Sequence, residues 1–201
     1  PSLTNTKIHR LRYHKGLWHA HSENKSFISK AIVMTMPSEQ VKDLLSKSTP
    51  EYDFAIPKPR YRSFYTCTFS SISDVKFMES KDHRDFSWIM NNTMKGIHNP
   101  KLIYTVNTSK NLTSKLQIME KIDQVDLVGK TLSNHGFKQI NDLKLHFWKY
   151  GFTENKSSME YSWNPELGIG ACGDGYGHGN IDGAITSAYH IKDPIIHLLN
   201  Q

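Results

Sequence analysis

The sequence predicts an α/β protein of the α+β kind, in which short strands outnumber helices. Three observations favour this class. Apolar and polar residues alternate over 8–13, as in a strand with one buried face. The run 31–36 is continuously apolar, which is typical of a strand buried on both faces. Helical spacing is confined to a few segments, and the longest of them is 112–132.

The first 47 residues predict a small antiparallel meander, a buried strand and a helix. Gly16 marks the first turn, and Pro37 ends the apolar run. Ser38 is a suitable N-cap, and the following residues place Val41, Leu44 and Leu45 on one helical face. The strands of this part are expected at 8–13, 17–20, 27–28 and 31–36, and the helix at 39–45.

The Pro-rich stretch 48–59 breaks this pattern and predicts a crossing into a second domain. There we expect a mixed or antiparallel sheet and one long helix at 112–132, ended by Gly136. The strands of this sheet are expected at 62–70, 72–81, 86–91, 102–107 and 143–150. The predicted domains are therefore a discontinuous one, 1–47 with 160–201, and a middle one, 48–159.

Glycine is concentrated in the tail, where seven of the 12 glycines lie between Gly168 and Gly183. The pattern predicts a strand at 167–174, a loop at 175–179 and a helix at 183–191 that Asn180 or Asp182 caps. Fixing so many glycines is costly, and close approach of the backbone to a ligand would explain it. A helix N-terminus at the same place favours an anionic or electron-rich group. The alternative is a glycine-rich turn packed on the sheet.

The bulk properties exclude several classes. The net charge is +6, but the basic residues are scattered, so a solvated strand face is favoured over a nucleic-acid patch. Without a signal-like segment or a membrane-spanning run, we predict a soluble, cytoplasmic protein with free, buried thiols at Cys67 and Cys172. His19 and His21 could share a strand face, yet no third metal ligand stands at useful spacing, so no metal is expected.

The tail segment 163–174, with 179–184 and Ser187, resembles the FAD-closing C-terminal motif of renalase-like proteins. More broadly, it resembles the flavin-containing amine oxidase superfamily. Segments 16–18, 31–37, 87–92 and 146–150 resemble further parts of that family in the same order. The resemblance implies an FAD-binding domain of the amine-oxidase type beside a substrate domain.

The resemblance also implies roles for particular residues. Asp174 would hydrogen-bond the ribityl or pyrophosphate part of FAD, and the backbone around Ile181 and Asp182 would face the flavin edge. The residues implied at the cofactor are Thr35, Pro37, Gly173, Asp174, Gly175, Asn180, Ile181, Asp182 and Gly183. Those implied at the substrate are Trp88, Asn91 and Trp148, for which packing in a core is the alternative. Because the flavin itself takes the hydride, no catalytic acid or base is named.

The sequence departs from this family at its start, because it has no Gly-x-Gly-x-x-Gly unit for the ADP half of FAD. We therefore expect a fragment, or a chain completed as a homodimer or by a second chain, with an open sheet edge. The expected function is hydride transfer to flavin from a small amine or a reduced nicotinamide dinucleotide. The alternative is a non-catalytic remnant or partner subunit that keeps the fold without binding FAD alone. Basic nucleic-acid binding is a third, less favoured hypothesis.

Overall fold

A computed structural model divides the chain into two compact units. The first unit comprises Pro1–Tyr61 and Phe152–Gln201, and the second comprises Arg62–Gly151. The structure describes residues 2–48, 55–75, 78–79, 84–92, 102–155 and 157–201. The domains predicted above were defined by what they bind, FAD or substrate. The division into two units does not test binding, so these domains stay a prediction.

The first unit opens with a three-stranded antiparallel meander of β1 (Arg10–His14), β2 (Leu17–His21) and β3 (Ser26–Ser29). Each predicted strand is present with slightly shifted ends. The turn between β1 and β2 needs two positive φ angles, 50° at Lys15 and 79° at Gly16. Leu11 and Trp18 point into the core of this unit, where both are fully buried.

A second sheet of the first unit has the order β10 (Ser162–Asn164), β11 (Ile169–Ala171) and β4 (Ile32–Met34). Strand β11 runs antiparallel to β10 and parallel to β4, although the two parallel strands are far apart in the sequence. The expectation of a strand buried on both faces holds only for Met34, whereas Ile32 and Val33 are partly exposed. This difference follows because β4 is the last strand of the sheet within the described residues.

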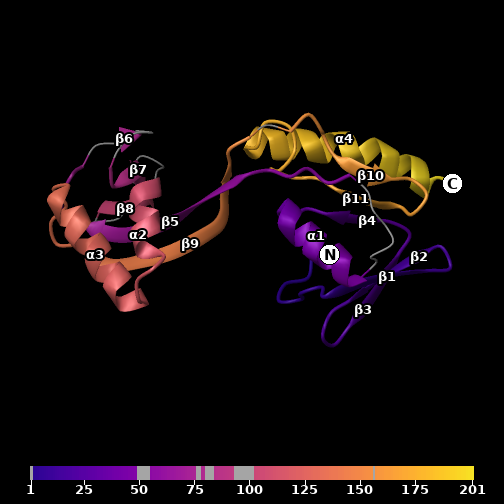
Figure 1. Cartoon of the computed structure of the whole chain (residues 1–201), viewed down its shortest axis with the longest axis horizontal. Helices are drawn as coiled ribbons and strands as arrows, with labels where there is room; N and C mark the ends of the chain where they lie inside the picture. Colours follow the sequence, from indigo (N-terminus) through magenta and orange to yellow (C-terminus); the bar gives the residue numbers. More distant parts are fainter. Residues whose placement is uncertain (1, 49–54, 76–77, 80–83, 93–101, 156) are drawn as a thin grey trace. The chain divides into compact units, whose positions relative to one another are not determined.

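Helices α1 (Ser38–Ser48) and α4 (Ile181–Leu199) complete the first unit (Figure 1). Val41, Leu44 and Leu45 of α1 are buried, as their spacing predicted. Helix α4 is longer than the predicted 183–191, because it continues through Pro194 instead of ending before it. A helical proline removes one backbone donor, yet the apolar residues beyond it extend the helix to Leu199.

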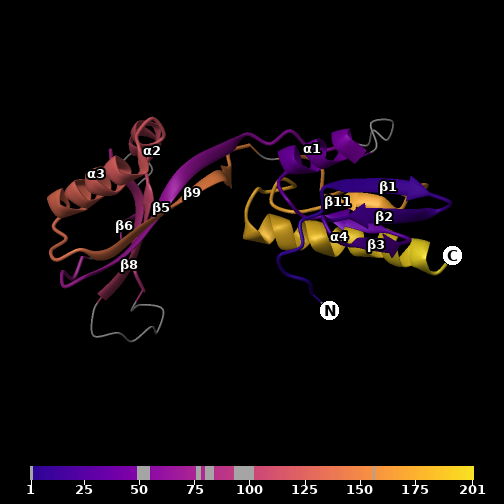
Figure 2. The ribbon, with the colours of Figure 1, turned by 90° about the horizontal axis from the view of Figure 1, so that it is seen from below.

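The second unit is a five-stranded sheet with helices on one face (Figure 2). Its strand order is β6 (Met78–Glu79), β7 (Phe86–Asn91), β8 (Leu102–Thr108), β5 (Tyr61–Ser71) and β9 (Asn141–Thr153). Helices α2 (Lys110–Leu116) and α3 (Lys121–Asn134) bury their apolar sides against the sheet. The predicted strand over 72–81 corresponds to the short β6, and part of that segment lies outside the described residues.

The single helix expected at 112–132 is instead two helices. Ser109 caps α2 by accepting a hydrogen bond from the backbone N–H of Leu112. Helix α2 ends at Leu116, and the Gln124 side chain of α3 donates to the carbonyl oxygens of Leu116 and Met119. These bonds satisfy carbonyls at the end of α2, so the chain can turn there although its apolar spacing continues. No helix in the described part of the chain is both long and apolar enough to cross a membrane.

Candidate cofactor site

The glycine-rich tail forms a strand, a loop and a helix N-terminus in the first unit. Strand β11 lies beside β4, and the N–H of Cys172 extends this pairing to the Met34 carbonyl at 3.1 Å. The carboxyl ends of two parallel strands therefore meet here, the place where open α/β sheets bind ligands. The predicted strand 167–174 is ordered as a strand only over Ile169–Ala171, and the rest belongs to the loop.

Gly173 follows β11 in a backbone conformation that only glycine adopts readily. Its φ angle is 141°. A Cβ atom at this position would lie 3.5 Å from the Thr35 carbonyl oxygen, which is an ordinary contact, so space remains beside the backbone. The structure thus brings Thr35 and Gly173, both predicted at the cofactor, next to each other across the two strand ends.

Gly175 and Gly183 are glycines for a different reason, because the protein itself fills the space beside them. A Cβ atom on Gly175 would lie 2.9 Å from the Ser38 hydroxyl oxygen and 3.2 Å from that of Tyr61. A Cβ atom on Gly183 would lie 3.1 Å from the backbone of both Tyr176 and His178. Packing explains these two glycines without a ligand, and their predicted contact with a cofactor stays a prediction.

The N-terminus of α4 presents free backbone donors. The Asn180 side chain caps the helix by accepting from the Gly183 N–H at 2.8 Å. Among the described residues, none accepts a hydrogen bond from the N–H of Ile181 or Asp182. The Ile181 side chain is 78% exposed, so this end of the helix is open. Such an end carries about half a positive charge and favours electron-rich groups.

Asp174 lies in the same loop with its carboxylate available. Its carbonyl oxygen accepts a hydrogen bond from the Thr153 hydroxyl at 3.3 Å, which fixes the backbone. No described residue donates a hydrogen bond to the carboxylate, so it can accept one from a hydroxyl group of a ligand. Burial, together with the charge of Asp174, raises the pKa of the neighbouring Tyr61 phenol.

Several residues that hold this loop were missed as site residues by the sequence reasoning. The Ser187 hydroxyl accepts from the Gly173 N–H, and the Tyr176 hydroxyl donates to the Ser162 oxygen at 2.9 Å. The Ser38 N–H donates to the Tyr61 hydroxyl oxygen. Only Ser187 had a signal, its place in the motif quoted above. The contacts of Tyr61 and Ser162 join distant segments and have no local signature.

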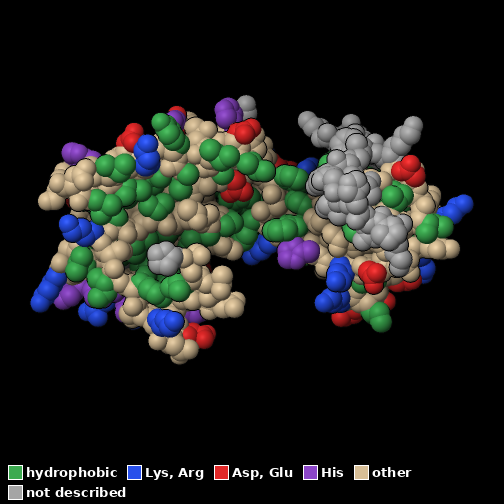
Figure 3. Space-filling model, turned by 180° about the vertical axis from the view of Figure 1, so that it is seen from behind, with side chains coloured by type: hydrophobic (Ala, Val, Ile, Leu, Met, Phe, Trp, Pro, Cys, Tyr) green, Lys and Arg blue, Asp and Glu red, His purple; other side chains and the backbone are tan. Residues whose placement is uncertain are grey.

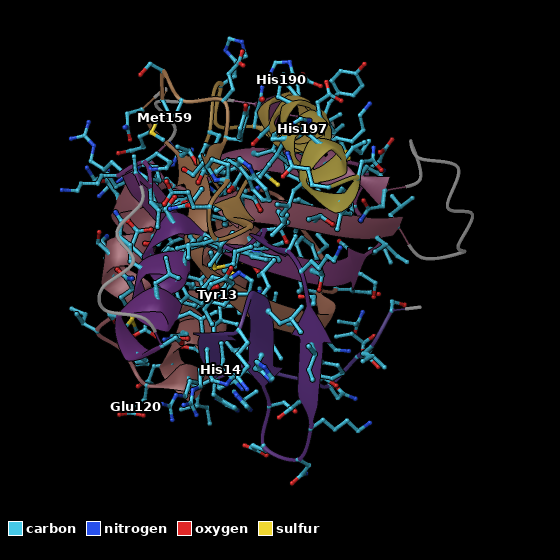
Figure 4. The ribbon with its side chains drawn as sticks, turned by 90° about the vertical axis from the view of Figure 1, so that its right-hand side faces the viewer. Tyr13, His14, Glu120, Met159, His190 and His197 are labelled. Atoms are coloured by element: carbon cyan, nitrogen blue, oxygen red, sulfur yellow. The ribbon has the colours of Figure 1, made fainter. Side chains whose placement is uncertain are left out.

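The described residues offer neither a metal site nor an activated nucleophile. No group of three or more potential metal ligands occurs among them. Both thiols are free and buried, as predicted, and burial raises the pKa of Cys67 to about 12 and also that of Cys172. His190 and His197 lie along α4 (Figure 4), and the Nδ1 atom of His190 is 2.8 Å from the Glu160 carboxylate.

The three predicted substrate residues all belong to the second unit, but they occupy different faces of its sheet. Trp148 donates a hydrogen bond to the Thr66 hydroxyl, and Trp88 is registered with Asn107 on the face that α2 and α3 leave uncovered. Asn91 lies on the helix-covered face, where its side-chain nitrogen is 3.5 Å from the Tyr104 hydroxyl oxygen. The structure therefore groups the two tryptophans and separates Asn91 from them.

Comparison with solved structures identifies the class of fold. A protein described as a protoporphyrinogen oxidase from Exiguobacterium aligns over 98% of this chain and 47% of its own, with 11% identity and a TM-score of 0.68. The cyclohexylamine oxidase of Brevibacterium oxydans aligns over 97% of this chain and 49% of its own, with 9% identity and a TM-score of 0.65. A fatty acid isomerase from P. acnes aligns over 94% of this chain and 47% of its own, with 12% identity and a TM-score of 0.56. No protein-family model and no curated protein matches the sequence.

This chain therefore has the fold of half of an amine-oxidase-type protein, which confirms the predicted fold class. It spans about half the length of the structures it resembles. Because an amine oxidase and a fatty acid isomerase share the fold, the fold alone does not decide the reaction.

Proposed function

We propose that this chain contributes one half of an FAD site in an oxidoreductase of the renalase or amine-oxidase type. The bound flavin would take a hydride from a small amine or a reduced nicotinamide dinucleotide. The protein's part in such chemistry is to bind and orient the flavin and to tune its electronics.

One observation carries the proposal: Gly173, with its left-handed backbone, and the carboxylate of Asp174 lie in the same short loop that leads to the unused N–H donors of α4. The N–H groups of Ile181 and Asp182 are unused by described residues and suit an electron-rich ring edge. The carboxylate of Asp174, in the same loop, suits a ribityl hydroxyl group. Donors for an electron-rich edge and an acceptor for hydroxyls are the two things that FAD requires here.

Titration of FAD with the full chain, followed by flavin absorbance and fluorescence, tests this proposal. Asp174→Ala should weaken FAD binding about tenfold, because a hydrogen bond to a charged group contributes about 1.5–3 kcal/mol. Glu166→Gln is the matched control, since Glu166 is an exposed carboxylate before β11 that takes no part in the loop. Unchanged flavin spectra at saturating FAD would contradict cofactor binding by this chain alone.

A second candidate function is that of a partner subunit which keeps the fold and binds FAD only with another chain or a second copy. It is favoured by β4, which has one neighbour among the described strands and leaves its second edge for a further strand. Exposed apolar side chains on α4 point the same way: Ile181, Ile185 and Tyr189 are spaced four residues apart and are 78%, 64% and 63% exposed. Figure 3 shows hydrophobic side chains gathered in a band across one face of this unit.

The two candidates differ in their oligomeric state. The partner function predicts a homodimer or a hetero-complex. An unpaired strand edge and an exposed apolar stripe both favour association with another chain that covers them. Analytical ultracentrifugation over a range of concentrations measures this. A chain that stays monomeric and binds FAD alone would contradict the second candidate and support the first.

A further inference from the structure

Four side chains form one row across the sheet of the second unit, on the face opposite its helices. The register pairs Trp88 of β7 with Asn107 of β8, and Asn107 with Thr66 of β5. Trp148 of β9 completes the row, because its indole nitrogen lies 3.0 Å from the Thr66 hydroxyl oxygen. We call Trp88, Asn107, Thr66 and Trp148 the tryptophan row. Registered partners in antiparallel strands share a face, so the row is a continuous surface.

The hydrogen bonds within the tryptophan row fix which atoms remain available. The Trp148 indole N–H donates to Thr66, and the Thr66 hydroxyl donates to the side-chain oxygen of Asn107 at 2.8 Å. The Asn107 oxygen is thereby occupied, and its NH2 group turns away from Thr66. No described residue accepts from that NH2 group. The row therefore offers two amide donors to a ligand.

The ring of Trp148 provides the flat part of this surface. Trp148 is 47% exposed although its N–H is bonded inside the row. The His146 ring meets it edge-on, with centroids 4.4 Å apart and planes at 67°, which supports its orientation. An exposed indole face that is held in place by a hydrogen bond and a second ring suits stacking with a planar group.

Charges near the row disfavour an ammonium ligand. The residues two positions along each strand on the same face include Met90, Thr105, Thr68 and His146, and none carries a carboxylate. An ammonium group over Trp148 would gain a cation–π contact of about 0.5–1 kcal/mol, but its protons would face the amide donors of Asn107. A carbonyl oxygen at that point would instead accept from Asn107.

We propose that the tryptophan row binds a planar ring that carries a carbonyl acceptor, as the nicotinamide group does. The ring stacks on Trp148 and covers Thr66, and its carbonyl oxygen accepts from the NH2 group of Asn107 on the next strand. Trp88 borders the far end of the row. This assignment goes beyond the proposed function, because the row lies within the second unit and its ligand is defined by the row's own ring and donors.

The test uses the full chain without FAD, so its outcome is independent of flavin binding. The sequence has four tryptophans, and their indole N–H signals can be followed by NMR while nicotinamide is added. We expect the Trp148 signal to shift with an affinity in the millimolar range, as is usual for so small a ligand. Pyridine, which lacks the carbonyl, and cyclohexylamine, a ring of the same size that is cationic and not planar, should bind at least tenfold more weakly.

Asn107→Leu, which keeps the volume and removes the donors, should weaken nicotinamide binding at least tenfold and reduce its advantage over pyridine. Trp163→Phe, in β10 of the other unit, is the matched control and should leave the titration unchanged. Equal binding of nicotinamide and pyridine to the unaltered chain would overturn the proposal, as would tighter binding of cyclohexylamine. A shift confined to the Trp163 signal would also overturn it.

Discussion

The Ser187 hydroxyl accepts a hydrogen bond from the backbone N–H of Gly173 at 3.2 Å and so joins helix α4 to the end of strand β11. Ser187 follows Gly173 by 14 residues in the sequence and is buried inside the first unit, with 1% of its surface exposed. This bond fixes the loop between strand and helix, the loop that carries Asp174 and the α4 N-terminus. The geometry of the candidate cofactor site therefore depends on a residue that would not touch the cofactor.

Ser187→Ala should destabilise the first unit. The substitution leaves the Gly173 N–H without its partner, and an unsatisfied buried donor costs about 1–3 kcal/mol. The free energy of unfolding in urea measures this change. Thr186→Ala is the matched control on the exposed side of the same helix and should change stability by less than about 0.5 kcal/mol. Equal effects of the two substitutions would contradict a structural role for the Ser187 bond.

Gly173→Ala and Gly129→Ala should change stability in opposite directions. At Gly173 the φ angle of 141° strains any residue with a Cβ atom, at a cost of about 1–3 kcal/mol. At Gly129, inside α3, a Cβ atom would meet only the Leu143 side chain at 3.8 Å, so alanine should stabilise by about 0.5–1 kcal/mol. Thermal unfolding measures both. A stabilising Gly173→Ala would contradict the backbone conformation described for the loop.

Tyr176 should make the first unit sensitive to alkali. Burial raises the pKa of Tyr176 from 10.0 to about 12 in the folded chain. The folded state therefore holds this proton more tightly than the unfolded state, and the stabilisation is complete below pH 10. As the pH rises from 10 towards 12, the unfolded state ionises first and about 3 kcal/mol is lost.

Unfolding free energies measured across this range for the unaltered chain and for Tyr176→Phe test the assignment. The substitution should lower stability at neutral pH, because Ser162 no longer accepts the hydrogen bond from Tyr176, and it should flatten the fall above pH 10. An equally steep fall in the variant would assign the alkaline loss to other groups. Cys67 lies in the second unit, and its pKa is also raised, from 9.0 to about 12. It therefore contributes to the loss of stability of that unit as the pH rises above 9.0.

Local pattern predicted most of the elements but not their partners. Alternation located β1, and the glycine spacing located the loop before α4, because these signals depend on residues close in the sequence. The parallel pairing of β4 with β11 joins segments more than a hundred residues apart and left no local trace. The break between α2 and α3 was missed because Leu116, Met119 and Leu127 keep helical spacing across it.

In the candidate site, too, the sequence predicted the local features and missed those that depend on tertiary packing. The resemblance named Gly173, Asp174 and Asn180, and the structure places all three in one loop with its helix cap. It also named Asn91 with Trp88. These two residues are three positions apart in β7, and because side chains alternate along a strand with a two-residue period, they point to opposite faces. Which side of β7 is covered by helices depends on tertiary packing, and the sequence alone has no signal for it.

Tyr104→Phe should destabilise the second unit because its hydroxyl group loses its hydrogen bonds, two of which join it to the backbone. The Tyr104 hydroxyl donates to the Ser73 carbonyl at 2.5 Å and accepts from the Val75 N–H at 3.0 Å, and the side chain is fully buried. Phenylalanine fills the same volume but leaves both groups without a partner, so we expect a loss of about 1–3 kcal/mol in urea unfolding. Tyr189→Phe removes a hydroxyl from a ring that is 63% exposed and should cost almost nothing. If the two variants are equally stable, the segment at Ser73 and Val75 is held by other contacts than Tyr104.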